Sequence, residues 1–393
     1  MRQYESTHPW IAFRADLSLA RTDFWVLLGE VQSKCEHVAG VPLPIPAHDH
    51  LNRVYLAKGA LATTAIEGNT LSEEEVQKHL AGELRLPPSK QYLAREIDNI
   101  VAACNDVWRD ESGRFETLTV DAVKEFNRRV LDGLQLDESV VPGKVRTHSV
   151  GVAHYRAAPP EDCEYLLERL CEWLSSPEFS PPGQTALAFA VLRAVLAHLY
   201  LAWIHPFGDG NGRTARLVEF CILVHAGVPQ PSAHLLSNHY NATRAEYYRQ
   251  LDLASRSGGD IIPFLRYAVQ GLVDGLRDQL HVIREVQLDI AWRDFLNESL
   301  RKLKPSESTQ RKRHLALALS DANEPVPRGQ LTSLTPDVAR AYARKTAKAV
   351  SRDLNFLIRE GLVRKGTGGF LSAKQRMLAF RPRRKQRPAA SSS

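Results

Sequence analysis

The chain of 393 residues is poor in cysteine: it has five, and no two of them form a Cys-x-x-Cys pair. The odd number and the wide spacing argue against a disulfide framework and against a cysteine-based zinc site. They are typical of proteins from a reducing compartment. We therefore expect small hydrophobic residues or inert surface thiols at the five positions, which are Cys35, Cys104, Cys163, Cys171 and Cys221.

The first ten residues, MRQYESTHPW, are polar and lack the apolar core of a signal peptide. Only one long apolar stretch is present, at residues 184–204, and its length alone would allow it to cross a membrane. Arg193 and His198 in its middle favour a buried central helix instead. These absences predict a cytoplasmic protein of two or three domains that has no membrane association.

Positive and negative charges are not evenly distributed along the chain. Residues 301–393 carry 22 Lys and Arg against 6 Asp and Glu, which leaves 29 against 39 in residues 1–300. The formal net charge of +6 therefore comes from a basic C-terminal part joined to an acidic body. A basic domain of this size favours nucleic acid as a partner.

One segment of twelve residues concentrates reactive side chains. Residues 205–216 read HPFGDGNGRTAR and lie between two stretches with helical character, residues 184–204 and 211–226. A glycine-rich turn that leads into a helix N-terminus is predicted, and unpaired backbone N–H groups and the positive end of the helix dipole suit anions there. A ligand could approach the backbone closely at the three glycines of the turn, Gly208, Gly210 and Gly212.

The polar side chains of this turn suit a polyphosphate and a divalent cation. His205 carries an imidazole, which titrates near neutral pH as a general base should. Asp209 offers a hard oxygen ligand for Mg²⁺. Arg213 and Arg216 lie one helical turn apart, where both guanidinium groups can hold phosphate oxygens. The structural alternative is that Asp209 caps a helix, the glycines form a tight turn and the arginines are solvated.

The whole segment matches the pattern H-x-F-x-[DE]-G-N-G-R-x-x-R and so resembles the motif of Fic-domain proteins. Every fixed position is present, namely His205, Phe207, Asp209, Gly210, Asn211, Gly212, Arg213 and Arg216. The resemblance implies transfer of AMP from ATP to a Ser, Thr or Tyr hydroxyl of a target protein, with His205 as the base and Asp209 as the Mg²⁺ ligand. It also implies a nucleotide site made of Asp209, Gly210, Asn211, Gly212, Arg213, Thr214, Ala215 and Arg216.

A second segment, TTAIEGNT at residues 63–70, resembles the inhibitory motif [ST]-x-x-x-E-[GN] of the same family. Residues 50–67 are expected to form a helix that ends at the Gly68-Asn69 pair, and Ser72 with Glu75 predicts a capping box for the next helix.

Glu67 would then lie on the last turn of its helix, where the dipole disfavours an anion and a cationic partner is needed. The resemblance implies that Glu67 reaches Arg216 and obstructs the position of the ATP γ-phosphate, so that the protein is autoinhibited. A solvated glutamate beside a turn is the structural alternative.

Apolar and polar residues alternate modestly over residues 143–160, which contain β-branched residues and end at a Pro-Pro pair. This pattern predicts a short hairpin. The hairpin resembles the Fic flap, which binds a target segment by strand addition. The resemblance implies that four flap residues line the nucleotide, Val150, Gly151, Val152 and Ala153. A purely structural hairpin is the alternative.

Residues 235–251 resemble the family segment that follows the motif and carries a Tyr pair. The resemblance implies that Tyr247 faces the adenine, and stacking on the base suits an aromatic ring. A core tyrosine at helical spacing is the alternative. Ser255 stands where relatives have an Asn that touches the nucleotide.

The basic C-terminal part has the order of elements of a winged helix-turn-helix. Helices are predicted over residues 309–321, 326–334 and 336–360, the last one broken near residues 344–346, and two short strands within residues 361–372. Several polar side chains could face DNA, Lys345, Lys348, Ser351, Arg352 and Asn355, with Arg364 and Lys365 on the wing. Four apolar residues would face inward, Val350, Leu354, Leu357 and Ile358. A winged helix used only for protein contacts is the alternative.

The predicted fold is thus mainly α, with a Fic-type helical core, a β-hairpin flap and a C-terminal winged helix. The expected divisions are an N-terminal helical region (1–110), a catalytic core (111–275), a linking helix (276–303), the winged helix (304–380) and a disordered basic tail (381–393). The expected function is an adenylyltransferase that uses ATP and Mg²⁺, with removal of AMP as a possible reverse reaction. DNA and a second copy of the chain in a homodimer are further partners that we expect. The alternative function is a DNA-binding transcription regulator whose Fic fold only senses nucleotide.

Overall fold

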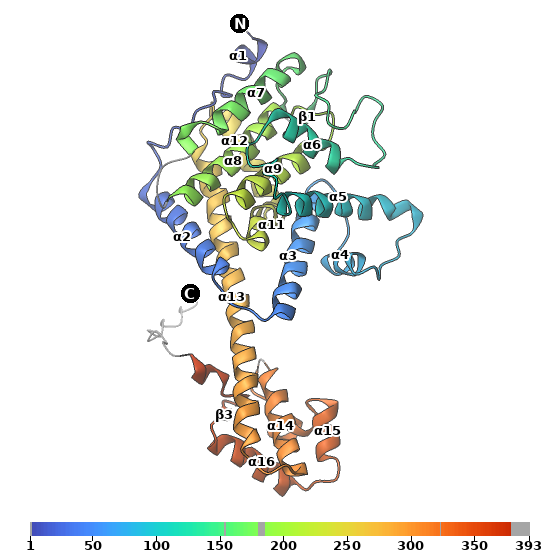
Figure 1. Ribbon diagram of the computed structural model, residues 1–393, viewed down its shortest axis with the longest axis vertical. Helices are drawn as coiled ribbons and strands as arrows, with labels where there is room; N and C mark the ends of the chain where they lie inside the picture. Colours follow the sequence, from blue (N-terminus) through green and yellow to red (C-terminus); the bar gives the residue numbers. More distant parts are fainter. Residues whose placement is uncertain (1, 153–154, 180–184, 323, 379–393) are drawn as a thin grey trace, which may run out of the picture. The chain divides into compact units, whose positions relative to one another are not determined.

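The computed structural model describes residues 2–152, 155–179, 185–322 and 324–378 (Figure 1). Ala153, which we predicted to line the nucleotide, lies outside these residues. The chain divides into two compact units, Met1–Leu280 and His281–Ser393. Finer domain boundaries within each unit stay a prediction.

The first unit is built mainly of helices, with one pair of short strands. Its helices in chain order are α1 (Gln3–Thr7), α2 (Thr22–Ala39), α3 (Ile45–Ala65), α4 (Glu73–Leu80), α5 (Gln91–Trp108), α6 (Val120–Val130), α7 (Cys163–Leu174), α8 (Ala186–Ile204), α9 (Asn211–His225), α10 (Gln230–Ala233), α11 (Leu235–Ala242) and α12 (Arg244–Arg256). Helix α13 (Ile262–Arg301) spans the boundary between the units. It begins earlier than the linking helix that we predicted, since Asp260 accepts a hydrogen bond from the backbone of Ile262 at its start (3.1 Å).

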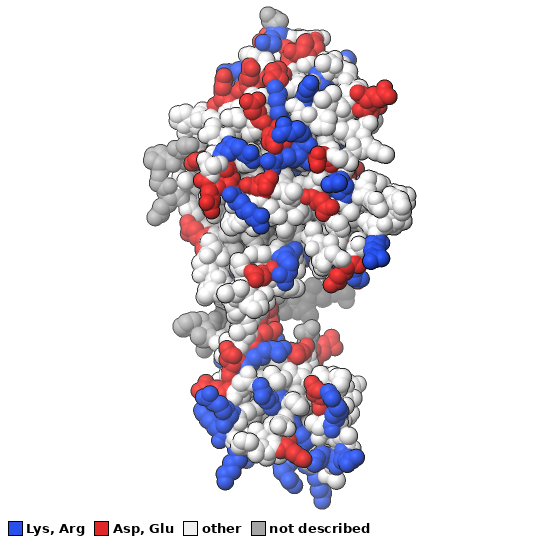
Figure 2. Space-filling view, turned by 45° about the vertical axis from the view of Figure 1, so that its right-hand side comes forward, with Lys and Arg blue, Asp and Glu red and all other residues white. Residues whose placement is uncertain are grey.

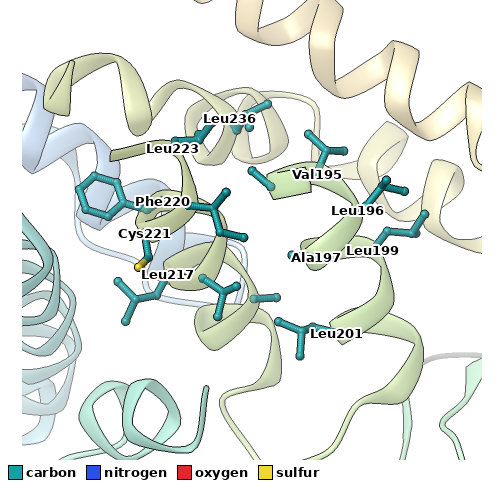
Figure 3. Close-up of a cluster of buried hydrophobic side chains, with 14 of the residues drawn as sticks. Val195, Leu196, Ala197, Leu199, Leu201, Leu217, Phe220, Cys221, Leu223 and Leu236 are labelled. Carbon is teal, nitrogen blue, oxygen red and sulfur yellow. The ribbon is translucent and has the colours of Figure 1, made fainter. Parts of the chain in front are cut away.

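Helix α8 forms the centre of the first unit. It is apolar on all sides, so every face must be covered, and it packs against α9, α7 and α2. Figure 3 shows α8 and α9 side by side, with Ala197 and Leu201 on the side of α8 that faces α9. Among the described residues, α8 is the one helix long and apolar enough to cross a membrane, and 78% of its most apolar window is buried inside the unit. This burial agrees with the prediction of a central core helix.

The N-terminal helices and the helices around residues 205–216 share one hydrophobic core. Helix α3 packs against α11, α5 and α9, and α5 and α6 both pack against α9. The elements that carry Glu67 and the arginines of α9 are therefore in direct contact. All five cysteines are free, as predicted, and all are buried, so the expectation of small hydrophobic residues holds and that of surface thiols does not.

Helix α3 begins and ends earlier than predicted. It starts at Ile45 and ends at Ala65. Glu67 therefore lies in the turn that follows the helix and not on its last helical turn. Gly68 adopts a φ of +108°, which terminates the helix, and the N–H of Asn69 donates to the carbonyl of Thr64 (3.2 Å). The predicted capping box of Ser72 and Glu75 at the start of α4 is confirmed.

Two short strands precede α7. Strands β1 (Gly151–Val152) and β2 (Tyr155–Arg156) pair antiparallel, with Gly151 opposite Arg156. The N–H of Ala157 donates to the carbonyl of Val150 (3.2 Å), which extends the pairing by one residue. A strand pair thus lies where the sequence predicts a hairpin, and its use as a flap stays a prediction.

In its described residues the second unit contains the end of α13, three further α-helices and a pair of strands. The elements after α13 are α14 (Glu307–Ser320), α15 (Pro336–Tyr342), α16 (Ala347–Arg359), β3 (Val363–Gly366) and β4 (Gly369–Ser372), and a 3₁₀ helix (Arg328–Ser333) replaces the predicted helix over 326–334. The strands pair antiparallel, and residues 343–346 separate α15 from α16 as expected. Val350, Leu354 and Leu357 of α16 are buried in the core of this unit, and Ile358 packs partly buried against it.

Candidate active site

His205 ends helix α8 in a strained conformation. Its φ and ψ of 49° and 60° place it in the left-handed region, which non-glycine residues rarely adopt. Arg146 stabilises this backbone, because its Nε donates to the carbonyl of His205 (2.8 Å) and its Nη1 to the carbonyl of His148 (2.7 Å). Arg146 is itself buried. The sequence analysis did not single it out, although its position beside the predicted hairpin was a usable signal.

The environment of His205 keeps its imidazole neutral. Burial lowers the pKa of His205 to about 4, and the positive charge of Arg146 acts in the same direction, while Glu67 partly opposes them. A neutral imidazole at pH 7 can accept a proton, which a general base must do.

Side-chain hydrogen bonds shape the loop after His205. Asn211 accepts from the N–H of Phe207 (2.9 Å) and donates to its carbonyl (2.8 Å). Phe207 is buried and forms a β-bridge with Val145. The amide of Asn211, which we predicted to hold phosphates, is therefore already engaged with the loop backbone.

Asn127 of α6 is a second residue that holds this loop and that the sequence analysis missed. Its Nδ2 donates to the carbonyl of Asp209 (2.9 Å) and to Thr214 Oγ1 (3.3 Å), and its Oδ1 accepts from the N–H of Gly143 (2.9 Å). Gly210 begins α9 with a φ of +74°, and a Cβ there would press against Asn127. The side chain of Thr214 thus faces the loop scaffold.

Glu67 and Arg216 form an ion pair in which the arginine is buried and the glutamate side chain is 32% exposed. Arg216 Nη2 donates to Glu67 Oε1 (2.5 Å) and to the carbonyl of Thr63 (2.8 Å), and Arg216 is only 1% exposed. Burial by itself would raise the pKa of Glu67, but the charge and hydrogen bond of Arg216, together with the charge of Arg213, outweigh it, so the pKa is lowered and the carboxylate stays ionised. A Cβ at Gly212 would collide with Glu67 Oε1. The carboxylate therefore lies against the first turn of α9, where the helix dipole favours an anion.

Arg213 is held by two carboxylates. Its Nη1 donates to Glu96 Oε1 of α5 (2.8 Å) and its Nη2 to Asp209 Oδ1 (3.2 Å). Asn69 donates to the other oxygen of Glu96 (2.9 Å). Burial raises the pKa of Glu96, with Arg213 opposing the shift. The sequence analysis missed Glu96, although it lies one turn from Leu93 and Ile100 on the apolar face of α5.

Both arginines keep donors that no described residue satisfies. Arg213 Nε, Arg216 Nε and Arg216 Nη1 are buried without a hydrogen-bond partner in the described part of the chain. Unsatisfied buried N–H groups of a cation are costly, and an anion with several oxygens would satisfy them.

The site residues border one cavity of about 670 Å³. Eight of the predicted positions are in its wall, namely Glu67, His205, Asp209, Gly210, Asn211, Gly212, Ala215 and Tyr247. Arg213, Thr214 and Arg216 are not among its lining residues and lie behind this wall on α9. Tyr247 is also almost fully buried. It therefore borders the cavity, as expected of an adenine contact, and packs in the core, as expected of the structural alternative. On the strand pair, Tyr155 borders the cavity, whereas Val150 and Gly151 are not among its described lining residues. Ser255 is turned away and donates to the carbonyl of Asp252 (2.9 Å), which itself lines the cavity with Leu251.

The helical core and its loop define a known class of protein. Residues 117–223 match the model of the Fic/DOC family, and the chain therefore carries a domain of this family. Curated relatives are named protein adenylyltransferase: fic-1 of Caenorhabditis elegans is 30% identical over 251 residues, which are 63% of this chain and 44% of that protein. The protein Fic of Nematostella vectensis is 29% identical over 247 residues, 62% of this chain and 53% of that protein. The match thus spans about half the length of these relatives.

Solved structures share the fold. Fic-1 of Caenorhabditis elegans (residues 134–508) has a TM-score of 0.53 at 25% identity, over 68% of this chain and 74% of that one. A Fic family protein from Desulfovibrio desulfuricans G20 has a TM-score of 0.52 at 19% identity, over 87% of this chain and 92% of that one. The second likeness supports the fold alone.

Proposed function

We propose that this protein transfers AMP from ATP to a hydroxyl group of a target protein. One observation carries the proposal: a neutral His205 borders the same cavity as the first turn of α9, next to two arginines with unsatisfied donors. The base, the anion site and the space for a nucleotide are thus adjacent. The names of the curated relatives favour this enzyme over a protein that only senses nucleotide.

The residues suggest how the transfer would proceed. His205 takes the proton of the target Ser, Thr or Tyr hydroxyl, and the oxygen attacks the α-phosphorus of ATP. The bond from the α-phosphorus to the bridging oxygen breaks, and pyrophosphate leaves. Arg213 and the backbone N–H groups at the start of α9 stabilise the shifting negative charge. The target segment would dock on the strand pair β1–β2 by adding a strand.

Asp209 fits the Mg²⁺ that this reaction requires. Its carboxylate is about half exposed (48%) and borders the cavity. Among the described residues no three His, Cys, Asp or Glu side chains come together as a metal cage. A single carboxylate suits Mg²⁺, which takes its other ligands from phosphates and water. When bound, the ion would neutralise phosphate charge.

The proposal includes autoinhibition by Glu67. Its carboxylate lies on the first turn of α9 and pairs with Arg216, so it takes up the place and the cation that a terminal phosphate needs. The same carboxylate lies near enough to His205 to affect its pKa and could orient a water for the reverse reaction, removal of AMP.

The position of the transferred phosphorus tests the proposed reaction. With ATP labelled at the α-phosphorus, we expect label to enter protein; with ATP labelled at the γ-phosphorus, we expect none, because the γ-phosphate leaves in pyrophosphate. Label from the γ-position alone would identify a phosphotransferase and reject AMP transfer.

A second function, DNA binding, is proposed for the second unit. Figure 2 shows Lys and Arg side chains clustered on the surface of this unit. On α16 the acidic Asp353 is turned inward, where Tyr342 (3.1 Å), Arg311 (3.2 Å) and Ser308 (3.4 Å) hold it. Because Asp353 is buried, the exposed face of this helix carries Lys348, Arg352 and Asn355 without a carboxylate beside them. Such a face suits a phosphate backbone.

One lysine and one arginine of that face, Lys348 and Arg352, provide a test of DNA binding. Replacing Lys348 and Arg352 with alanine should make the negative slope of log K against log salt shallower by about 2. Each of the two groups releases roughly one counterion from the DNA when it contacts a phosphate. The matched control replaces Arg340 and Arg359, which are as exposed but pair with Asp337 and Glu360. Affinity is measured by fluorescence anisotropy with duplex DNA. An equal loss of DNA affinity in both variants would show only an effect of net charge.

A further inference from the structure

A chain of buried polar side chains runs through the core beside the cavity. Glu219 of α9 accepts from Tyr240 Oη (2.9 Å) at one oxygen, and its other oxygen lies 3.4 Å from His198 Nδ1. His198 Nε2 contacts Tyr247 Oη at 2.8 Å. All four side chains are at most 3% exposed. Burying a carboxylate costs free energy unless its oxygens have polar partners. The position of Glu219 in the core therefore depends on Tyr240 and His198.

The carboxylate favours one arrangement of hydrogens. His198 Nδ1 has no hydrogen-bond partner at normal distance among the described residues, and the nearest acceptor is Glu219. A proton on Nδ1 therefore faces negative charge, which leaves Nε2 free to accept from the hydroxyl of Tyr247. The hydroxyl of Tyr247 is then directed into the core and not into the cavity.

The ring of Tyr247 also packs against two aromatic neighbours. It stacks on Tyr240 with 4.9 Å between ring centroids and 26° between planes, and it meets His198 edge to face at 88°. Two independent contacts thus fix the ring that borders the cavity. A fixed aromatic wall suits the flat, apolar face of a nucleobase, because little side-chain entropy is lost on stacking.

We propose that Glu219 and His198 are positioning residues that hold Tyr247 as the stacking wall for the nucleotide base. This role rests on the proposed use of ATP. Neither residue touches the reacting phosphorus; they act on binding of the base through the hydroxyl of Tyr247. Loss of the carboxylate should weaken binding of ATP but leave the transfer step itself unchanged.

The experiment measures equilibrium binding of ATP and of inorganic triphosphate, which has no base. All variants carry Glu67→Gly so that the phosphate site is open. Glu219→Leu removes the acceptor for His198 at similar volume, and loss of one buried hydrogen bond predicts ATP binding about tenfold weaker. Binding of triphosphate should stay within about twofold of the background, as expected for a site on the opposite end of the nucleotide. Glu219→Gln keeps an acceptor oxygen and should restore most of the ATP affinity.

A double variant separates positioning from a general loss of packing. If Glu219 acts through the hydroxyl of Tyr247, then adding Glu219→Leu to Tyr247→Phe should weaken ATP binding no further. Tyr240→Phe is the matched control, because it removes the other contact of Glu219 and leaves the pair with His198. Additive losses, or equal weakening of ATP and triphosphate, would overturn the proposal. ATP binding without transfer in the background protein would reject the proposed reaction alone.

Discussion

Replacing Glu67 with glycine is expected to increase incorporation of AMP by on the order of 100-fold, since release of its ion pair with the buried Arg216 changes the free energy of ATP binding by a few kcal/mol. In the native chain the Glu67 carboxylate lies on Gly212 and pairs with Arg216 at 2.5 Å. Removal of the side chain opens the start of α9 and frees the guanidinium for a phosphate. Self-labelling with ATP labelled at the α-phosphorus measures the increase.

The same substitution should destabilise the protein when no nucleotide is bound. Arg216 is 1% exposed, and its main counter-charge would be lost. Because Glu67 is 32% exposed, we expect a cost of roughly 1–3 kcal/mol, which is below that of a fully buried pair. The melting temperature should therefore fall, and ATP should raise it more in the variant than in the native chain.

Glu83→Gly is the control for this experiment, because Glu83 is an exposed glutamate in a loop of the same region. Labelling of Glu67→Gly at the level of the native chain would reject inhibition by this residue, whatever the melting temperatures.

Replacing His205 with alanine in the Glu67→Gly background is expected to reduce transfer by roughly 10² to 10⁴, the usual contribution of a general base. ATP binding should persist, since the arginines and the start of α9 remain. A variant that binds ATP and transfers AMP at the background rate would exclude His205 as the base. Equilibrium binding and labelling on the same samples give both quantities.

The pKa of His205 predicts the pH profile of that reaction. With a pKa lowered to about 4 in the native chain, the imidazole is neutral from pH 8 to pH 5. The Glu67→Gly background lacks a carboxylate that raises this pKa, so transfer should stay level over that range and fall only at or below pH 4. A solvated histidine, with a pKa of about 6.5, would lose half its activity near that pH. The sign for stability is consistent: the unfolded chain takes up the proton first, so the folded state loses stability as pH falls from 6.5 towards 4.

Local patterns in the sequence predicted several parts of the structure. The apolar segment before His205 had no polar face, so a buried central helix was the physical solution, and α8 is that helix. Ser72 and Glu75 are three residues apart and form the capping box by themselves. In the C-terminal part, the sequence predicted an interruption of the helix near residues 344–346, and residues 343–346 separate α15 from α16.

The end of α3 differs from its prediction for a local reason, whereas the partner of Arg213 comes from a distant segment of the chain. The end of α3 moved to Ala65 because the positive φ of Gly68 and the hydrogen bond from Asn69 to Thr64 terminate the helix. Arg213 meets Glu96, which lies 117 residues away in the chain. No spacing rule connects such positions.

The sequence by itself determined the chemistry of the loop at residues 205–216, because its imidazole, carboxylate, glycines and guanidinium groups are contiguous and lie between two helices. Only the tertiary structure decided how these groups are set. Burial keeps His205 neutral, α3 brings Glu67 onto the first turn of α9, and α5 supplies Glu96 to Arg213. The physical reason is that pKa values and ion pairs depend on distance and solvent exposure, which packing sets and sequence spacing does not.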